Sequence, residues 1–182
     1  MPSDQVRNII LVGFMASGKS SVGRALARRT GWPRVDADEE IVSRAGKPIA
    51  EIFRDSGEDA FRQLEREVTS DICKESGRII AAGGGSFIDD QNRQTMLDCG
   101  TVFYLSAKPE TIHRRVTRGN PNAPARPMLP GGDPLQRITE LLAERMPAYT
   151  QAHHAVETDG LSPEQVAQAI IKICGPGIEK KS

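Results

Sequence analysis

A glycine-rich segment near the amino terminus constrains the fold more than any other part of this sequence. Residues 13–20 read GFMASGKS and match the pattern G-x-x-x-x-G-K-[S/T]. The run Asn8–Gly13 that leads into it is continuous and rich in β-branched residues, typical of a strand buried on both faces, and an amphipathic segment follows from Lys19. In this context the backbone N–H groups of the loop and the amino end of the helix can wrap phosphate groups. The segment therefore predicts a binding site for ATP or GTP.

The individual positions of this loop indicate which groups would hold the phosphates. Lys19 would place its positive charge on the β- and γ-phosphates, and the Ser20 hydroxyl suits a magnesium ligand. A glycine-rich turn without a ligand is the alternative, which the Lys-Ser pair and the strand–helix context disfavour. The expected nucleotide-binding residues are Ala16, Ser17, Gly18, Lys19, Ser20 and Ser21.

Short apolar runs alternate with helix-length segments along the rest of the chain. The expected strands are Asn8–Gly13, Pro33–Asp36, Arg78–Ala82, Thr101–Leu105 and His154–Glu157. The expected helices are Lys19–Arg29, Pro48–Ser76 (more than one helix), Asp89–Asp98, Pro109–Arg118, Asp133–Ala152 and Ser162–Cys174. Strands that alternate with helices form right-handed crossovers and a parallel sheet covered on both faces. We therefore expect a single α/β doubly wound domain over residues 1–175 and a frayed tail over residues 176–182.

Composition excludes several classes of function. The 182 residues contain 24 Lys and Arg against 24 Asp and Glu, so no overall basic field attracts nucleic acid or an anionic membrane. The apolar stretch Ile9–Val12 is far shorter than the roughly 20 residues that span a bilayer, and residues 1–8 lack the pattern of a signal peptide. Three widely spaced cysteines indicate neither a disulfide framework nor a zinc site. We expect a cytoplasmic monomer with no nucleic-acid or membrane partner.

Two carboxylates follow the second expected strand. Asp36 and Asp38 lie where strand ends line the ligand crevice of an open α/β sheet, beside the glycine-rich loop. If strand geometry persists, the two residues point to the same face, so that one can meet the water shell of a magnesium ion and the other an acceptor hydroxyl. Helix N-capping, which involves no chemistry, is an equally good interpretation of the residues alone.

Arg62 lies at the edge of a predicted buried stripe. Phe61, Leu64 and Val68 have helical spacing, and Arg62 flanks them by about 100° around the axis. An arginine at a core edge near a crevice suits a carboxylate, which its planar fork grips through two hydrogen bonds. A surface ion pair is the alternative, and it is favoured when the residue is judged alone.

Three consecutive glycines, Gly83, Gly84 and Gly85, follow the third expected strand. Such a run is entropically costly. It is useful where the backbone must approach a ligand with no side chain between them. A tight turn needs only one or two glycines, so we interpret the run as part of a binding site.

A proline- and glycine-rich segment interrupts regular structure over residues 119–134. It carries five prolines and three glycines, and a helix cannot persist through them. A loop of this length in a compact domain is usually functional or disordered. We interpret it as a lid that closes over the site and excludes water, with a passive surface loop as the alternative.

The ordered combination of these motifs resembles the shikimate kinase family over residues 8–174. The matching segments are GFMASGKS (13–20), VDADEEI (35–41), IAEIF (49–53), GEDAFRQLE (57–65), GGG (83–85), ARPML (125–129) and ERMPAY (144–149). The resemblance implies a P-loop NTPase of the nucleoside-monophosphate-kinase type, with three α/β/α layers, a five-stranded parallel sheet of order 2-3-1-4-5 and a lid. It also implies transfer of the γ-phosphate of ATP, with Mg²⁺, to the 3-hydroxyl of shikimate, in the biosynthesis of chorismate and aromatic amino acids.

The resemblance assigns roles to individual positions. Asp38 would hold the reacting hydroxyl and act as its base, and Asp36 would support magnesium through water. Arg62 and Arg145 would clamp the substrate carboxylate, with Gly83–Gly85 against the ring hydroxyls. Arg126 would reach the phosphates from the lid, and Arg115 would lie against the adenine.

The sequence departs from the family pattern at a few positions and leaves two other functions open. Ala16 stands where the family often has glycine, the lid is longer than in compact members, and residues 158–162 lack the adenine-side arginine of some members. A related kinase for gluconate or a nucleoside monophosphate is one alternative. A nucleotide-gated binding protein without transfer activity is the other, and the Asp36–Asp38 pair beside the loop disfavours it.

Overall fold

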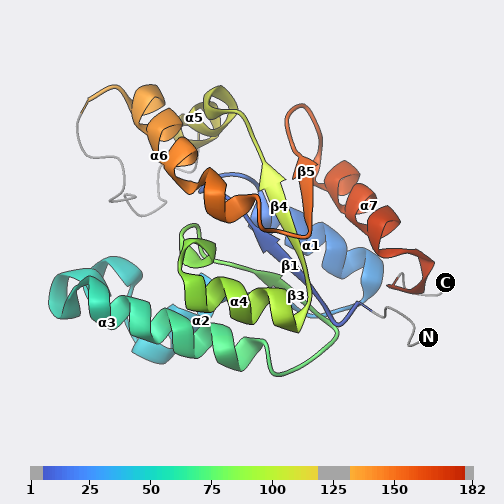
Figure 1. The fold of residues 1–182 in the computed structure, drawn as a ribbon, viewed down its shortest axis with the longest axis horizontal. Coiled ribbons are helices and arrows are strands. Elements are labelled where there is room, and N and C mark those ends of the chain that lie inside the picture. Colours follow the sequence, from blue (N-terminus) through green and yellow to red (C-terminus); the bar gives the residue numbers. More distant parts are fainter. Residues whose placement is uncertain (1–5, 119–131, 179–182) are drawn as a thin grey trace.

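A computed structural model describes residues 6–118 and 132–178 and contains a five-stranded parallel sheet (Figure 1). The strands are β1 (Asn8–Val12), β2 (Arg34–Asp36), β3 (Arg78–Ala81), β4 (Thr101–Ser106) and β5 (His154–Glu157). Their order across the sheet is β2-β3-β1-β4-β5, and every neighbouring pair is parallel. The expected strand order 2-3-1-4-5 is therefore confirmed.

Seven α-helices connect or flank the strands in the described residues. They are α1 (Lys19–Thr30), α2 (Ala37–Ala45), α3 (Ile49–Ile72), α4 (Asp90–Cys99), α5 (Pro109–Thr117), α6 (Pro134–Tyr149) and α7 (Pro163–Cys174). Short 3₁₀ helices form at η1 (Ser86–Ile88) and η2 (Pro176–Ile178). Within these described ranges no helix combines the length and the apolar character that a bilayer crossing requires.

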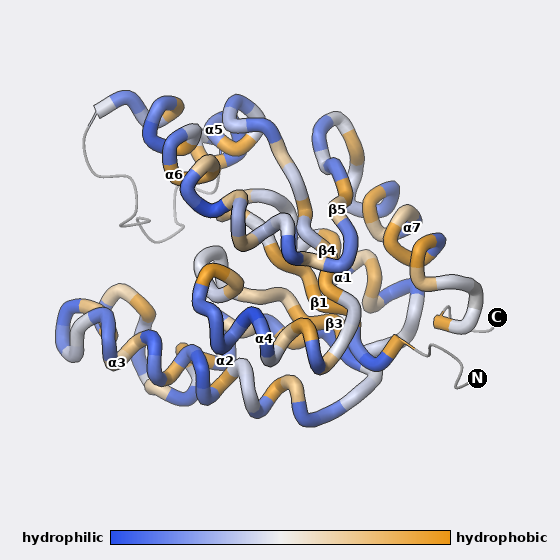
Figure 2. The backbone as a smooth tube through the Cα atoms, in the orientation of Figure 1, coloured by the Kyte–Doolittle hydropathy of each residue, from blue (hydrophilic) through white to orange (hydrophobic). Residues whose placement is uncertain are grey.

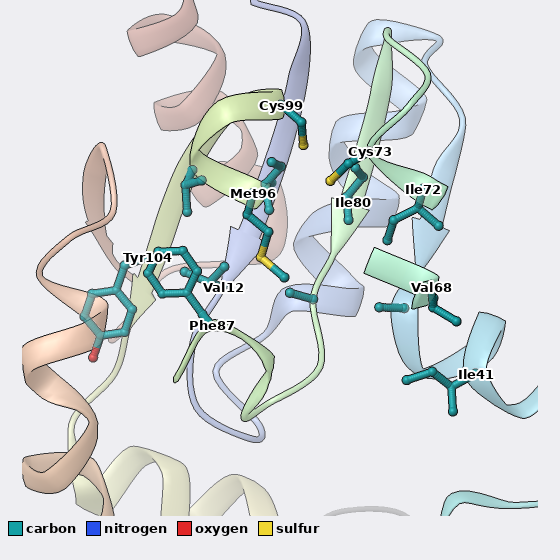
Figure 3. Packing of buried hydrophobic residues seen from close by; sticks show 14 of the residues in the cluster. Val12, Ile41, Val68, Ile72, Cys73, Ile80, Phe87, Met96, Cys99 and Tyr104 are labelled. Carbon is teal, nitrogen blue, oxygen red and sulfur yellow. The ribbon is translucent and has the colours of Figure 1, made fainter. Parts of the chain in front are cut away.

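The alternation of side chains along β1 explains the layered packing. Ile9 and Leu11 belong to a hydrophobic core formed with α1 and α7, whereas Ile10 and Val12 belong to the core beneath α2, α3 and α4. Successive strand residues point to opposite faces, so a strand covered on both sides must be apolar throughout. Figure 2 shows hydrophobic residues along β1 and β3, and Figure 3 shows part of the second core, with Met96 of α4 among its labelled members.

The second strand ends at Asp36, as expected, so the same-face arrangement that a continued strand would give Asp36 and Asp38 does not apply and the N-capping interpretation is confirmed. Asp36 is the N-cap of α2, and its side chain accepts hydrogen bonds from the N–H groups of Asp38 and Glu39. Three acidic residues in the first turn of α2 also suit the positive end of the helix dipole. The sequence interpretation contained no helix over residues 37–45, because the short acidic segment was assigned to the strand end.

The segment predicted to hold more than one helix is broken at Gly57. This residue has φ 82° and ψ 176° within α3, a left-handed φ that favours glycine. At the other end of the chain, Ile178 is only 7% exposed and packs against the core of α1 and α7. The packed chain therefore continues past residue 175, where a frayed tail was expected, and residues 179–182 lie outside the described ranges.

Candidate active site

The glycine-rich loop joins the end of β1 to the start of α1 and has little room for side chains. A Cβ placed on Gly13 would lie 2.8 Å from the Leu105 carbonyl oxygen and 2.8 Å from Ser17 Oγ. Gly18 has φ 102° and forms the N-cap of α1. Both glycines are therefore required by the course of the backbone, and the amino end of α1 begins directly at the loop.

Polar groups of the loop suit an anionic ligand. The Lys19 ammonium donates hydrogen bonds to the carbonyls of Gly13 and Phe14, at 2.8 and 2.9 Å, which holds its charge at the loop. Ser17 Oγ is buried and has no hydrogen-bond partner among the residues that the structure describes. Ala16, the non-glycine departure noted above, has φ 57°, so the loop keeps a conformation that glycine would adopt more easily. A buried hydroxyl beside a lysine and a helix amino end is the donor set expected around phosphate oxygens.

The second strand brings a carboxylate to the same loop. Ser20 Oγ donates to Asp36 Oδ2 at 3.1 Å, and Arg34 donates to the same oxygen at 3.0 Å. The hydroxyl and carboxylate fit a magnesium ion that keeps several waters and takes further oxygens from phosphates. In the described part of the chain no group of three or more His, Cys, Asp or Glu residues could hold a metal ion.

Asp38 faces a different neighbour from Asp36. Because Asp38 lies in the first turn of α2, its carboxylate reaches the loop after β3, where a Cβ placed on Gly83 would lie 2.7 Å from Asp38 Oδ1. The same Cβ would lie 3.4 Å from Glu65 Oε1. The absence of a side chain at Gly83 therefore lets Asp38 approach the loop backbone.

Two arginines from distant helices meet at the end of the glycine run. A Cβ placed on Gly85 would lie 3.7 Å from both terminal nitrogens of Arg62 and 3.9 Å from Nη2 of Arg145. Arg145 also donates through Nη1 to the Gly84 carbonyl at 3.1 Å. The structure thus brings together the two guanidinium groups that the resemblance paired, and an anion at Gly85 would have both within reach.

The paired arginines lie next to the nucleotide loop. A Cβ placed on Gly84 would be 3.6 Å from the Met15 backbone nitrogen, and the Arg145 guanidinium lies 5.1 Å from the centroid of the Phe14 ring. Phe14 and Met15 belong to the glycine-rich loop, so the wall of Gly83–Gly85 is shared between the two sites. A ligand held by the arginines would therefore be adjacent to the phosphates.

Arg115 occupies the other side of the nucleotide loop. Its Nη1 donates to the Ala16 carbonyl at 3.2 Å, and its Nη2 donates to the Thr158 carbonyl at 3.3 Å. Thr158 follows β5, so Arg115 joins the loop to the far end of the sheet. Of the expected lid, residues 119–134, the part over 119–131 with Arg126 lies outside the described residues, and Pro134 is the first residue of α6.

The sequence interpretation missed Glu65, a buried carboxylate that pairs with Arg62 and lies near Gly83, as Asp38 does. Its side chain is 3% exposed and accepts from Arg62 at 2.9 Å. Burial raises the pKa of Glu65, while Arg62 opposes the shift and Asp38 adds to it. The available signal was its spacing: Glu65 stands four residues after Phe61 on the predicted buried stripe, where a charged residue is rarely found without a partner.

Comparisons with known proteins point to one family. Residues 15–174 match the family model described as "Shikimate kinase". A shikimate kinase of Thermodesulfovibrio yellowstonii is 40% identical over 167 residues, which cover 92% of this chain and 94% of the relative. A solved shikimate kinase from Acinetobacter baumannii in complex with shikimate is 34% identical, with a TM-score of 0.86 and 93% of each chain covered.

A gluconokinase from Sinorhizobium meliloti has the same fold at lower similarity. Its structure is 18% identical, covers 93% of this chain and 92% of its own, and has a TM-score of 0.58. At this identity the comparison concerns the arrangement of helices and strands alone.

We predict that Glu65→Gln makes the stability of the protein less dependent on pH. The raised pKa means that above the usual value of 4.5 the folded protein holds a proton that the unfolded chain releases. By linkage, the Glu65 contribution to the free energy of unfolding falls as pH rises through the folded pKa. Urea denaturation from about pH 4.5 to about pH 7.5 should therefore show a steeper fall for the wild type than for the variant.

Glu58→Gln is the matched control for this experiment. Glu58 is 68% exposed and pairs with the same arginine, so its variant should follow the wild-type profile. Parallel profiles for the wild type and Glu65→Gln would contradict the assignment.

Proposed function

This chain belongs to the shikimate kinase family, and on that premise we propose how its residues divide the work of the reaction. The reaction transfers the γ-phosphoryl group of ATP to the 3-hydroxyl of shikimate and gives shikimate 3-phosphate and ADP. The observation that carries the proposal is the meeting of Arg62 and Arg145 at Gly85, on a wall shared with the nucleotide loop. An acidic acceptor bound there has its hydroxyls next to the phosphates.

We propose that Arg62 and Arg145 bind the carboxylate of shikimate. A guanidinium presents a planar fork that matches a carboxylate, and two forks select an acidic acceptor over a neutral polyol. Glu65 supports this role because it holds Arg62 through a buried ion pair on one side. Gly83–Gly85 would then lie against the ring hydroxyls, where side chains would exclude the ring.

Asp38 is the group proposed to accept the proton of the reacting hydroxyl. The position of its carboxylate beside Gly83 supports this role, because the same loop would hold the ring. Asp38 would orient the hydroxyl toward the γ-phosphorus and accept its proton during phosphoryl transfer. The proton moves from the hydroxyl to a carboxylate oxygen of Asp38 as the new P–O bond forms and the bond to ADP breaks.

The phosphate side of the site follows from the loop and the second strand. Lys19 and the N–H groups at the start of α1 would hold the β- and γ-phosphates, and Ser20 and Asp36 would hold Mg²⁺, Asp36 through water. When bound, Mg²⁺ neutralises charge that develops on the phosphate oxygens. We propose Arg115 for the adenine side, because its contacts to Ala16 and Thr158 put it beyond the phosphate loop.

Several features stay predictions from the sequence. They are the lid over residues 119–134 with Arg126 acting on the phosphates, the organisation of residues 1–175 as one domain, the monomeric state and the cytoplasmic location. The lid would exclude water, which otherwise competes with the acceptor hydroxyl for the phosphoryl group.

A screen of acceptors tests the proposed function directly. ADP release with ATP and Mg²⁺ would be measured by a coupled assay with shikimate, gluconate and AMP as acceptors, and the phosphorylated product would be identified. We expect turnover on shikimate alone, because only this acceptor combines the carboxylate with a ring that fits the glycine wall. Turnover on gluconate or AMP without turnover on shikimate would refute the acceptor assignment, and nucleotide binding without any product would indicate a binding protein.

Asp38→Asn should abolish most turnover while leaving nucleotide affinity intact. The amide has nearly the shape of the carboxylate but does not accept the hydroxyl proton, and positioned general bases contribute about 10²–10⁴-fold in rate. We expect kcat to fall by about that factor, with the Kd of ADP within about twofold of the wild type. Asp59→Asn, at an exposed position of α3, should behave as the wild type. An unchanged kcat would remove Asp38 from the chemistry.

Lysine at either clamp position should weaken binding of the acid but not of the nucleotide. An ammonium cannot reproduce two parallel hydrogen bonds, and a lost charged hydrogen bond corresponds to roughly tenfold or more in affinity. We therefore expect Arg62→Lys and Arg145→Lys to raise the KM for shikimate by about tenfold or more and to change the KM for ATP by less than about twofold. Arg54→Lys, at a side chain that is 70% exposed, is the control. Equal effects on both KM values would argue against a carboxylate clamp.

A further inference from the structure

The middle carbonyl of the glycine wall is held differently from its neighbours. The Gly83 and Gly85 carbonyls accept backbone hydrogen bonds from Ser86 and Ile88, both at 3.1 Å, in the turn that forms η1. The Gly84 carbonyl instead accepts from two side chains of α6: Nη1 of Arg145 and the phenol of Tyr149, both at 3.1 Å. The orientation of this peptide therefore depends on α6 and not on the turn itself.

Tyr149 is a rigid donor for this contact. Its side chain is 1% exposed, and its ring stacks on Tyr104 of β4, with centroids 4.6 Å apart and planes 8° apart. Burial raises the pKa of Tyr149 to about 12, so the phenol keeps its proton at neutral pH and can donate. A buried ring stacked on a sheet residue has little rotamer freedom, which fixes the direction of the O–H group.

The spacing on α6 links this donor to the substrate clamp. Arg145 and Tyr149 are four residues apart and lie on the same face of the helix, where they share one acceptor. With Nη1 on the Gly84 carbonyl, the other terminal nitrogen of Arg145 faces Gly85 and Arg62. A rotation of the Gly84 peptide would remove a hydrogen bond that helps to orient this guanidinium.

We propose that Tyr149 is a positioning residue for the acceptor: its phenol holds the Gly84 carbonyl, which in turn aims the Arg145 guanidinium at the substrate carboxylate. The proposal rests on the carboxylate-binding role of Arg145 given above. Glycine makes such a support necessary, because a peptide between glycines has no side chains to limit its rotation. Tyr149 does not itself touch the substrate.

Tyr149→Phe tests the proposal, with Tyr104→Phe as its matched control. Both variants remove one phenol oxygen from the same stacked pair, but the Tyr104 hydroxyl points to the Met146 sulfur at 3.6 Å and not to the glycine wall. The Kd of shikimate would be measured by calorimetry, the KM of each substrate and kcat by the coupled assay, and the Tm by thermal unfolding. One hydrogen bond corresponds to roughly a 3–10-fold effect.

We expect Tyr149→Phe to raise the Kd and KM of shikimate by about 3–10-fold, with the KM of ATP and kcat within about twofold of the wild type. Tyr104→Phe should leave all four constants unchanged. Because Tyr149 acts through Arg145, the same substitution in an Arg145→Lys background should change the Kd of shikimate by less than about twofold.

Three outcomes would overturn the proposal. They are an unchanged Kd of shikimate in Tyr149→Phe, equal losses for shikimate and ATP that follow a lower Tm, and the full loss persisting in the Arg145→Lys background. Failure of the proposed function is recognised separately, because then Arg145→Lys itself leaves the KM of shikimate unchanged, or the wild type has no turnover on shikimate.

Discussion

The parallel pairing of β1 with β3, and of β3 with β2, is the constraint on which the site depends. The register aligns Ile10 with Ile80 and Ile80 with Val35, so the three strands end at one edge of the sheet. The glycine-rich loop, the Asp36 cap and the Gly83–Gly85 wall each begin at one of these ends. Neighbouring parallel strands must be joined by crossover connections, usually helices, so this edge of the sheet depends on helices that pack against the strands. The apolar residues of the strands therefore contribute to the site by holding three polar loops side by side.

The site also depends on matching charges that are only partly exposed to water. Asp36 is paired with Arg34, and Glu65 is paired with Arg62. A buried charge without a partner would be strongly unfavourable, so each arginine lowers the free-energy cost of burying its carboxylate. Arg145 donates through Nη1 to the neutral carbonyl of Gly84 at 3.1 Å.

Much of this arrangement could be predicted from the sequence, and the parts that could not have identifiable reasons. The buried run Asn8–Val12 and the loop after it have the pattern typical of a strand followed by a phosphate loop. The helix at Ala37–Ala45 was missed because an acidic residue after a strand is compatible both with continued strand and with a cap, and local pattern does not choose between them. Nor does periodicity reveal that Arg62 and Arg145 meet at Gly85, since the two residues lie on α3 and α6, which are far apart in the sequence. The resemblance supplied their pairing; the side-chain support from Glu65 and Tyr149 emerged only in three dimensions.

The choice of acceptor must then be made by side chains and not by the fold. A gluconokinase has the same arrangement of helices and strands at 18% identity. The fold by itself therefore does not determine the acceptor. What the fold provides is the nucleotide loop and the edge beside it. In the proposed assignment, the acidic acceptor would be selected where two arginines from α3 and α6 converge on Gly83–Gly85, and Glu65 and Tyr149 would help to orient their guanidinium groups. Specificity in such a site resides as much in the residues that orient the two guanidinium groups as in the groups themselves, because a fork turned away from the carboxylate binds as a point charge and discriminates little.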